Sequence, residues 1–245
     1  MDAAPQAQQV PDVLVHAVKA SASLAACYLF ASLYPDIKRV REARATGAMP
    51  LLPLTSMFGN CVLWTIYGFL ARDFFPLVAT NAIGIGFSVF YLSVYFQFTP
   101  ERRAVQRQLV ATASALLLVS LYPVFSVEPR HVVQQRVGYV AIAVCAVMFG
   151  SPLVVVREVV RTQSTSALPF GMILAGVINS LLWLTYGLIV RDVFVVAPNS
   201  VNLLLGGVQL LLFCVYPSAA TPYSKLSKPK SAAEEDMDTK EASVA

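Results

Sequence analysis

The chain has 245 residues, of which 57% are hydrophobic and only 13% are charged, and its formal net charge is +4. Soluble domains carry about 25% charged residues, and here the charges stand in short blocks between long apolar runs. This pattern excludes an ordinary soluble domain and indicates a protein that crosses a membrane several times. The small positive excess then reflects membrane topology, so no nucleic-acid partner is expected.

Seven apolar runs follow a polar N-terminal stretch. They cover residues 13–34, 51–70, 75–98, 109–125, 137–156, 168–190 and 193–216. Each run is close to the roughly 20 residues that a membrane helix needs, and an unclosed span must be helical because lipid offers its backbone no partners. The sequence therefore predicts an all-α integral membrane protein with seven transmembrane helices. The tail 218–245, basic and then acidic, is expected to be disordered and cytosolic.

The basic residues between the runs predict the orientation in the membrane. Twelve follow the first, third, fifth and seventh runs: Lys38, Arg39, Arg41, Arg44, Arg102, Arg103, Arg107, Arg157, Arg161, Lys225, Lys228 and Lys230. Four follow the second, fourth and sixth runs: Arg72, Arg130, Arg136 and Arg191. Because cytosolic loops are enriched in Lys and Arg, the N-terminus is predicted outside and the C-terminus in the cytosol.

One stretch of the chain occurs twice. Residues 60–75 and residues 179–194 share Asn, Trp, Tyr, Gly, Arg, Asp and Phe in the same order and at the same spacing. We interpret this as an internal duplication. It predicts a parallel 3+1+3 plan, with a three-helix repeat in residues 1–108, a linker helix in 109–130 and a second repeat in 131–217. Across the repeats, Pro35 pairs with Pro152, Pro53 with Pro169, and Trp64 with Trp183.

Asparagine and tryptophan lie deep in the predicted helices. Asn81 and Asn199 stand inside apolar runs, where an amide left without partners costs free energy. Each therefore bonds a neighbouring helix or a polar ligand, and the sequence leaves both readings open. Trp64 and Trp183 lie about 12 Å from their Arg-Asp turns at about 1.5 Å per residue. This is nearer the membrane midplane than the interface, where they either pack helices or face a ligand.

No constellation of catalytic or metal-binding residues is recognised in the sequence. The four cysteines, Cys27, Cys61, Cys145 and Cys214, lie in apolar runs without metal-ligand spacing. We expect no enzyme activity, no metal and no cofactor. The cores of the second, third, fourth, sixth and seventh helices hold no Asp, Glu, Lys, Arg or His. Because ion-coupled carriers usually need such groups, this favours uniport over proton coupling.

The motifs together resemble the SWEET family of sugar transporters over about residues 20–217. They are Tyr34-Pro35-Asp36-Ile37, Leu52-Pro53, Trp64-Thr65-Ile66-Tyr67-Gly68, Thr80-Asn81 with Gly84, Ser151-Pro152-Leu153, residues 164–170, Trp183-Leu184-Thr185-Tyr186-Gly187 and Ala197-Pro198-Asn199. The first repeat departs from the pattern at Ala48-Met49-Pro50, which places a second proline close to Pro53.

The resemblance implies a bidirectional, facilitative sugar carrier that works by alternating access. It implies a sugar-binding pocket formed by Asn81, Asn199, Trp64 and Trp183. It also implies four hinge prolines, Pro35, Pro53, Pro152 and Pro169. An outer gate is implied that pairs Tyr67 with Asp192 and Tyr186 with Asp73; as an alternative, both aspartates are solvated turn residues. Two large indole rings leave a small pocket, which favours monosaccharides such as glucose over sucrose. The expected membrane is the plasma membrane, and family members often associate, so a homo-oligomer is compatible with the resemblance.

Two other function classes share features with this sequence. A seven-helix receptor also has its N-terminus outside, but it does not require a three-helix duplication. A related repeat-type transporter of amino acids would be expected to carry a Pro-Gln dipeptide at its helix breaks. Here those breaks read Tyr34-Pro35-Asp36 and Ser151-Pro152-Leu153, so the sequence favours the sugar carrier.

Overall fold

The computed structural model describes residues 11–148, 150–166 and 168–216, and these form an all-helical bundle. The expected disordered tail, 218–245, lies outside the described residues. In chain order the helical elements are α1 (Asp12–Ala31), α2 (Tyr34–Ala43), α3 (Leu52–Ala71), the kinked segment η1 (Phe74–Val78), α4 (Ala79–Phe98), α5 (Arg102–Phe125), α6 (Arg130–Met148), α7 (Gly150–Thr162), α8 (Phe170–Val190) and α9 (Val193–Val215).

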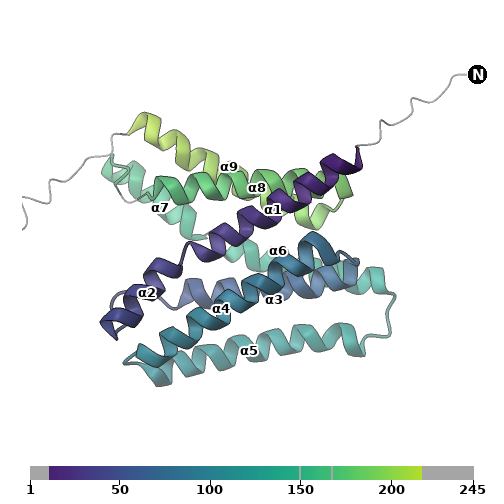
Figure 1. Cartoon of the computed structure of the whole chain (residues 1–245), viewed down its shortest axis with the longest axis horizontal. Helices are drawn as coiled ribbons and strands as arrows, with labels where there is room; N and C mark the ends of the chain where they lie inside the picture. Colours follow the sequence, from purple (N-terminus) through teal and green to yellow (C-terminus); the bar gives the residue numbers. More distant parts are fainter. Residues whose placement is uncertain (1–10, 149, 167, 217–245) are drawn as a thin grey trace, which may run out of the picture.

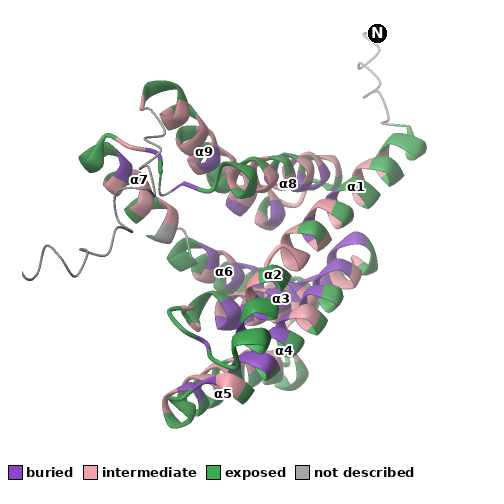
Figure 2. Ribbon diagram, turned by 60° about the vertical axis from the view of Figure 1, so that its left-hand side comes forward, coloured by how far each residue is buried: buried purple, intermediate pink, exposed green. Residues whose placement is uncertain are grey.

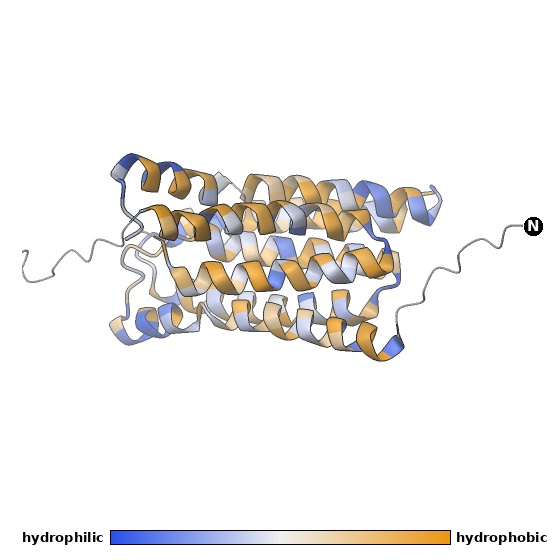
Figure 3. Cartoon of the chain, turned by 90° about the horizontal axis from the view of Figure 1, so that it is seen from above, coloured by the Kyte–Doolittle hydropathy of each residue, from blue (hydrophilic) through white to orange (hydrophobic). Residues whose placement is uncertain are grey.

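Seven helical spans in this bundle are long and apolar enough to cross a membrane, as the sequence predicted. They cover residues 12–43, 52–71, 74–98, 102–125, 130–162, 170–190 and 193–215. Hydrophobic residues dominate the middle of the bundle, and hydrophilic residues gather at both of its ends (Figure 3). The arrangement fits a hydrocarbon layer around the middle with water at each end.

The helices differ from the apolar runs mainly at their ends. α5 begins at Arg102 and α6 at Arg130, each seven residues before its apolar run. Arg and Gln favour helices as much as most apolar residues do, so a helix continues past the hydrocarbon edge into water. The first run also breaks between α1 and α2, where Pro35 is the second residue of the new helix.

The two repeats pack against each other through reciprocal helix contacts. Within the repeats, α3 packs on α4 and α8 on α9. Between the repeats, α1 packs on α8 and α3 on α6, so each repeat's first helix contacts the middle helix of the other. Figure 1 shows α1 and α6 between the α8–α9 pair and the α3–α4 pair, with α5 along the outer edge. This crossing encloses a space bounded by helices from both repeats.

Two clusters of buried side chains hold the bundle. One lies between the repeats and includes Trp64, Tyr67, Trp183 and Tyr186. The other joins α2, α3, α4 and α5 of the first half of the chain, and Figure 2 colours stretches of α3 and α4 there as buried. There, two buried tyrosines of α4 donate hydrogen bonds to backbone carbonyls: Tyr91 to Phe30 at 2.9 Å and Tyr95 to Met49 at 3.0 Å.

Candidate functional site

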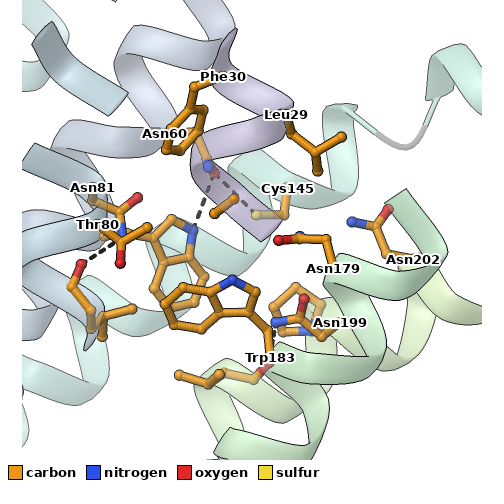
Figure 4. Close-up of a pocket in the computed structure, with 15 residues that line it drawn as sticks. Leu29, Phe30, Asn60, Thr80, Asn81, Cys145, Asn179, Trp183, Asn199 and Asn202 are labelled. Atoms are coloured by element: carbon orange, nitrogen blue, oxygen red, sulfur yellow. Dashed lines mark hydrogen bonds between the residues drawn. The ribbon is translucent and has the colours of Figure 1, made fainter. Parts of the chain in front are cut away.

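A cavity of about 170 Å³ lies between the repeats at the middle of the bundle. α3, α4, α6, α8 and α9 all contribute side chains to its wall, as does the end of α1. Its polar lining is mainly asparagine: Asn60, Asn81, Asn179, Asn199 and Asn202. The whole chain contains only these five asparagines, so every one of them faces this central cavity (Figure 4).

The two asparagines predicted from the sequence occupy equivalent places in the cavity wall. Asn81 Nδ2 donates to the Leu77 carbonyl, and Asn199 Nδ2 donates to the Val195 carbonyl, both at 2.8 Å. Each bond stays within the asparagine's own helix region, four residues back along the chain. Neither of these bonds joins neighbouring helices, and each leaves a side-chain oxygen and a second N–H available to the cavity.

The two tryptophans line the same cavity, and each is 7% exposed. Each ring meets the tyrosine three residues later edge-on, with centroids 5.5 Å apart for Trp64 and Tyr67 and 5.8 Å apart for Trp183 and Tyr186. The Trp64 indole donates to Asn60 Oδ1 at 3.2 Å, and the Cys145 thiol of α6 donates to the same oxygen at 3.3 Å. Asn60 therefore fixes the Trp64 ring and ties α3 to α6.

The equivalent asparagine of the second repeat, Asn179, differs from Asn60 in its hydrogen bonding. Asn179 lies one helical turn before Trp183, as Asn60 does before Trp64. Its side-chain oxygen is buried and has no hydrogen-bond partner within the described part of the chain. A buried acceptor without a partner costs about 1–3 kcal/mol, so a rearrangement that lets a ligand hydroxyl donate to this oxygen would recover that amount.

Sequence reasoning missed Asn60, Asn179, Asn202 and Thr80 as cavity residues. For Asn60 and Asn179 the signal was present, because both open the duplicated stretch and recur with the tryptophans. Asn202 lies three residues after Asn199 and has Gly84 as its counterpart in the first repeat, so the duplication does not single it out.

Four side chains predicted as a gate meet at one end of the bundle, which we call the carboxylate end. The Tyr67 hydroxyl donates to both carboxylate oxygens of Asp192, at 2.8 Å each. The Tyr186 hydroxyl donates to Asp73 Oδ2. Each bond joins one repeat to the other. The alternative that both aspartates are merely solvated turn residues does not describe this structure.

The environments of the two carboxylates differ. Asp192 caps the start of α9 by accepting from the backbone N–H groups of Phe194 and Val195. Burial raises the pKa of the Asp73 carboxyl above its ordinary value, although the hydrogen bond from Tyr186 opposes the rise. Gln134 Nε2 donates to the Tyr67 hydroxyl at 3.3 Å.

The same type of turn precedes each of the two aspartates, once in each repeat. Arg72 ends α3 and Arg191 ends α8 in the left-handed conformation, with φ of 60° and 56°. The next N–H, of Asp73 or Asp192, returns to the carbonyl of Gly68 or Gly187 at 2.9 Å in each repeat. This is the Schellman pattern of a helix C-terminus, and it turns each aspartate toward the other repeat.

The central cavity is closed toward the carboxylate end and continues toward the other end. Tyr67 and Tyr186 are 0% and 2% exposed and separate it from a cavity of about 800 Å³ at the carboxylate end. On the other side it shares Leu29, Asn179 and Asn202 with a cavity of about 240 Å³ that reaches Pro152 and Gln209. We call that side the proline end.

Three of the four predicted hinge prolines lie at helix starts at the proline end. Pro35 and Pro53 are the second residues of α2 and α3, and Pro169 caps α8. Proline is tolerated at such positions because no helical hydrogen bond is lost there. These three therefore mark breaks between helices, and Pro152 of α7 lies at the same end of the bundle.

The repeat register matches Pro169 with a fifth proline. Pro50 lies fourteen residues before Trp64, and Pro169 lies fourteen residues before Trp183. The preceding turns agree, because the N–H of Met49 bonds to the Thr46 carbonyl as that of Leu168 bonds to the Thr165 carbonyl. Pro53 falls opposite Met172 in this register.

A metal centre is not formed by the described side chains. Within residues 11–148, 150–166 and 168–216, no three His, Cys, Asp or Glu residues are grouped closely enough to hold an ion. What the cavity offers instead is amide donors and acceptors beside two aromatic rings, which is a set suited to a neutral, polyhydroxylated solute.

Comparison with known proteins was made on the sequence and on the fold. Residues 17–103 and 135–221 each match a family model described as "Sugar efflux transporter for intercellular exchange". The structure superposes on a eukaryotic SWEET transporter solved at 3.7 Å with a TM-score of 0.74 and 30% identity, covering 83% of this chain and 96% of the other. The double match and the superposition confirm the seven-helix fold with repeated three-helix units.

Curated relatives include proteins of rice and of a fruit fly. The bidirectional sugar transporter SWEET2b of Oryza sativa subsp. indica is 32% identical over 210 residues, which cover 84% of this chain and 91% of the relative. The sugar transporter SWEET1 of Drosophila pseudoobscura pseudoobscura is 30% identical over 177 residues, covering 72% and 78%. For SWEET15 of Oryza sativa subsp. indica, the 29% identical match covers 80% of this chain but spans only 62% of the relative's length.

Proposed function

The chain belongs to the SWEET family, which comprises sugar transporters and not enzymes, and from this premise we propose that it carries monosaccharides such as glucose across a membrane. Transport is bidirectional and downhill, without ion coupling. Among the described residues that line the central cavity, the thiol of Cys145 is the only titratable side chain. This supports uniport, since coupled carriers usually need intramembrane carboxylates or histidines.

The observation that carries the proposal is the composition of the central cavity. Asn81, Asn199, Trp64 and Trp183 approach it from equivalent positions of the two repeats. A pyranose presents hydroxyl groups around its rim and C–H groups on its faces. The amides supply both donors and acceptors for the rim, and the indole rings supply flat apolar surface for the faces.

The size of the cavity supports a monosaccharide. Its 170 Å³ corresponds to roughly a dozen water molecules at about 10–15 Å³ each. A hexose, with six carbons and six oxygens, matches that volume. A disaccharide such as sucrose would need about twice the space, so it would have to extend into the cavity of about 240 Å³ at the proline end.

The two ends of the bundle support alternating access. Tyr67–Asp192 and Tyr186–Asp73 act as the gate in its closed state, while the cavity continues toward the proline end. The moving bodies are the repeats 1–108 and 131–217, joined by the linker 109–130. The hinge prolines expected from the sequence are Pro35, Pro53, Pro152 and Pro169, and the repeat register favours Pro50 over Pro53 as the first-repeat partner of Pro169. Breaking the two bonds between repeats while closing the proline end exposes the sugar to the other side.

The carboxylate end is proposed to face the outside of the plasma membrane, with the N-terminus outside and the C-terminus in the cytosol. The basic residues of α2 and α7 support this, because they lie at the proline end, where the positive-inside rule places the cytosol. One chain encloses a complete cavity, so assembly into a homo-oligomer would multiply transport units without building the site.

The test is uptake and efflux of radiolabelled glucose in liposomes that contain the purified protein, with and without a pH gradient. Asn81→Ala and Asn199→Ala are compared with wild type. Gln97→Ala is the matched control, because it removes an exposed amide from the same helix as Asn81. We expect flux that ignores the gradient and falls at least about tenfold in both cavity variants, as the loss of ligand hydrogen bonds implies.

Three results would contradict parts of the proposal. No glucose flux from well-folded wild type would remove the monosaccharide claim, and sucrose and then amino acids would be tried next. Flux driven by the pH gradient would remove uniport. Flux unaffected by both asparagine substitutions would place the sugar site elsewhere.

A further inference from the structure

The two gate pairs are equivalent by duplication, but different side chains support them. Gln134 of α6 donates to the Tyr67 hydroxyl. Beside Tyr186 stands Lys19 of α1, with its Nζ 5.9 Å from the centre of the tyrosine ring. One pair therefore has a neutral amide beside it, and the other has a cation.

Lys19 faces the gate rather than the surrounding lipid. Its side chain is half-buried and lines the cavity at the carboxylate end together with Asp73 and Tyr186. A lysine near a helix end often extends its ammonium to the membrane interface, which requires no partner within the protein. Here the ammonium lies over an aromatic ring, where a cation is attracted to the π-electrons. Its charge also opposes the effect of burial on the Asp73 carboxyl.

The backbone of Lys19 is connected to the sugar cavity. The Ser23 hydroxyl donates to the Lys19 carbonyl at 3.0 Å, and the Thr80 hydroxyl donates to Ser23 Oγ at 2.8 Å. Thr80 lines the central cavity directly before Asn81. A short chain of hydrogen bonds thus fixes this turn of α1 against the cavity wall on α4.

From this arrangement we propose that Lys19 is a positioning residue of the gate, which stabilises the closed Tyr186–Asp73 pair and thereby sets how often the carboxylate end opens. This rests on the gate role given to that pair above. Lys19 and Asp73 belong to the first repeat and Tyr186 to the second. The first repeat therefore makes two contacts with Tyr186 of the second repeat. Asp73 accepts a hydrogen bond from its hydroxyl, and Lys19 lies over the face of its ring.

Both effects of Lys19 favour the closed state over the open one. The contact with the Tyr186 ring exists only while the repeats are together. Closing also buries the Asp73 carboxylate, and a nearby cation offsets part of that cost. Partly exposed interactions of this kind change equilibria by up to about fivefold, so a modest effect on gate opening is expected.

Cys145 is a natural reporter of gate opening, because it lines the central cavity behind the closed tyrosines. Intact cells that express the protein are treated with a membrane-impermeant maleimide, and labelling of Cys145 is followed by mass spectrometry. Lys19→Met removes the charge and keeps most of the side-chain stem, while Lys19→Arg keeps the charge. His16→Gln, one turn earlier on α1 and exposed, is the control.

We expect Lys19→Met to label about threefold faster than wild type, and Lys19→Arg and His16→Gln to match wild type. If the carboxylate end faced the cytosol, Lys19→Met would instead slow labelling from outside. A faster or a slower labelling rate in Lys19→Met thus supports the role of Lys19 in the gate. The direction of the change shows which end of the bundle faces the outside of the cell. Equal rates for wild type and Lys19→Met would overturn the proposal, as would a Lys19→Arg rate equal to that of Lys19→Met.

A second comparison assigns the effect to one gate pair. Lys19→Met should change labelling less in an Asp73→Asn background than in wild type, because the buried charge that it offsets is gone. It should keep its full effect in an Asp192→Asn background. Equal effects in the two backgrounds would overturn the assignment to Asp73. Labelling needs no sugar flux, so a failure of glucose transport would leave this result interpretable.

Discussion

Asn60 and Asn179 show how two copies of one residue acquire different roles. Asn60 Oδ1 already accepts from Trp64 and Cys145, whereas the oxygen of Asn179 has no partner in the described part of the chain. An acceptor that already receives hydrogen bonds within the protein stabilises the fold. An acceptor without such a partner can instead contribute to ligand binding.

Substituting the two asparagines should therefore give different phenotypes. Asn179→Ala is expected to raise the KM for glucose about five- to tenfold with little loss of stability, because it removes a ligand contact and a buried unsatisfied oxygen. Asn60→Ala is expected to lower Tm, because it releases the Trp64 ring and the tie to α6. Glucose transport kinetics and thermal unfolding in detergent measure the two effects. Identical profiles for the two variants would contradict this division.

The Asp73 carboxyl predicts a specific pH dependence. Burial raises its pKa in the closed gate, so the closed state binds a proton more tightly than an open state in which the carboxyl is hydrated. Protonation thus favours closure as the pH falls toward the raised pKa, and the effect disappears as the pH rises above it. We expect uptake to slow when the external pH is lowered from about 7 to about 4, where carboxyl groups titrate.

The titration is assigned by substitution. Asp73→Asn should flatten the pH response, whereas His131→Gln, a substitution in the lining of the same cavity, should preserve it. A response that disappears with His131→Gln and persists in Asp73→Asn would refute the assignment.

The sequence predicted the membrane-spanning parts of the helices, because hydropathy defines them. It did not predict the features that depend on polar residues, such as the helix ends. The seven apolar runs gave the seven spans, but they did not show that Arg102 and Arg130 already lie within helices. The duplication identified Trp64 and Trp183, but the vacancy at Asn179 depends on side-chain packing that only three-dimensional structure shows.

The kinked segment η1 lies where the two repeats differ in length. Asn81 lies eight residues after Asp73, whereas Asn199 lies only seven after Asp192. Phe75, in the interval of the first repeat, has an extended backbone, with φ of -139° and ψ of 123°. The chain is therefore not continuously helical between Asp73 and Asn81, and both asparagines still line the same cavity.

Close helix contacts near the gate depend on two glycines. A Cβ on Gly68 would lie 2.8 Å from Val78 Cγ2, and one on Gly187 would lie 3.0 Å from Val196 Cγ2. Gly68→Ala should cost about 1–3 kcal/mol of stability through overpacking, and Gly187→Ala somewhat less. Gly86→Ala is the control, because nothing lies within 4 Å of its Cβ. Thermal unfolding should place Gly86→Ala at or above wild type; a Gly68→Ala protein equally stable would disprove the packing argument.

The two prolines at the start of α3 can be told apart. Pro50 matches Pro169 in register, whereas Pro53 stands in the first turn of α3, where other residues fit equally well. We predict that Pro50→Ala lowers glucose transport several-fold and that Pro53→Ala leaves it near wild type. The reverse result would return the first-repeat hinge to Pro53.

The whole molecule is less symmetric than its duplication suggests. At the proline end, the first repeat is braced by Tyr91 and Tyr95 and by a buried cluster that reaches α5. In the register of Asn81 and Asn199, the residue opposite Tyr91 is Gln209, which lines the open cavity there. We therefore predict that the first repeat is the more rigid of the two and that the second repeat moves against it.

Hydrogen exchange should reveal this difference. Amides of residues 150–162 are expected to exchange about tenfold faster than those of residues 34–43, because local opening costs less where fewer contacts must break. Tyr91→Phe, which removes the bond to the Phe30 carbonyl, should narrow the difference by exposing α2. Equal protection of the two segments in wild type would mean that both repeats move alike.

The gathering of every asparagine around one cavity has a spectroscopic consequence. A protein labelled with ¹⁵N only at asparagine would show side-chain amide signals from Asn60, Asn81, Asn179, Asn199 and Asn202 and from no other site. Each NH₂ pair would then report on the transport cavity alone, without a crowded background from the other helices. Titrating sugars into such a sample would rank substrates by chemical shift, before any flux is measured.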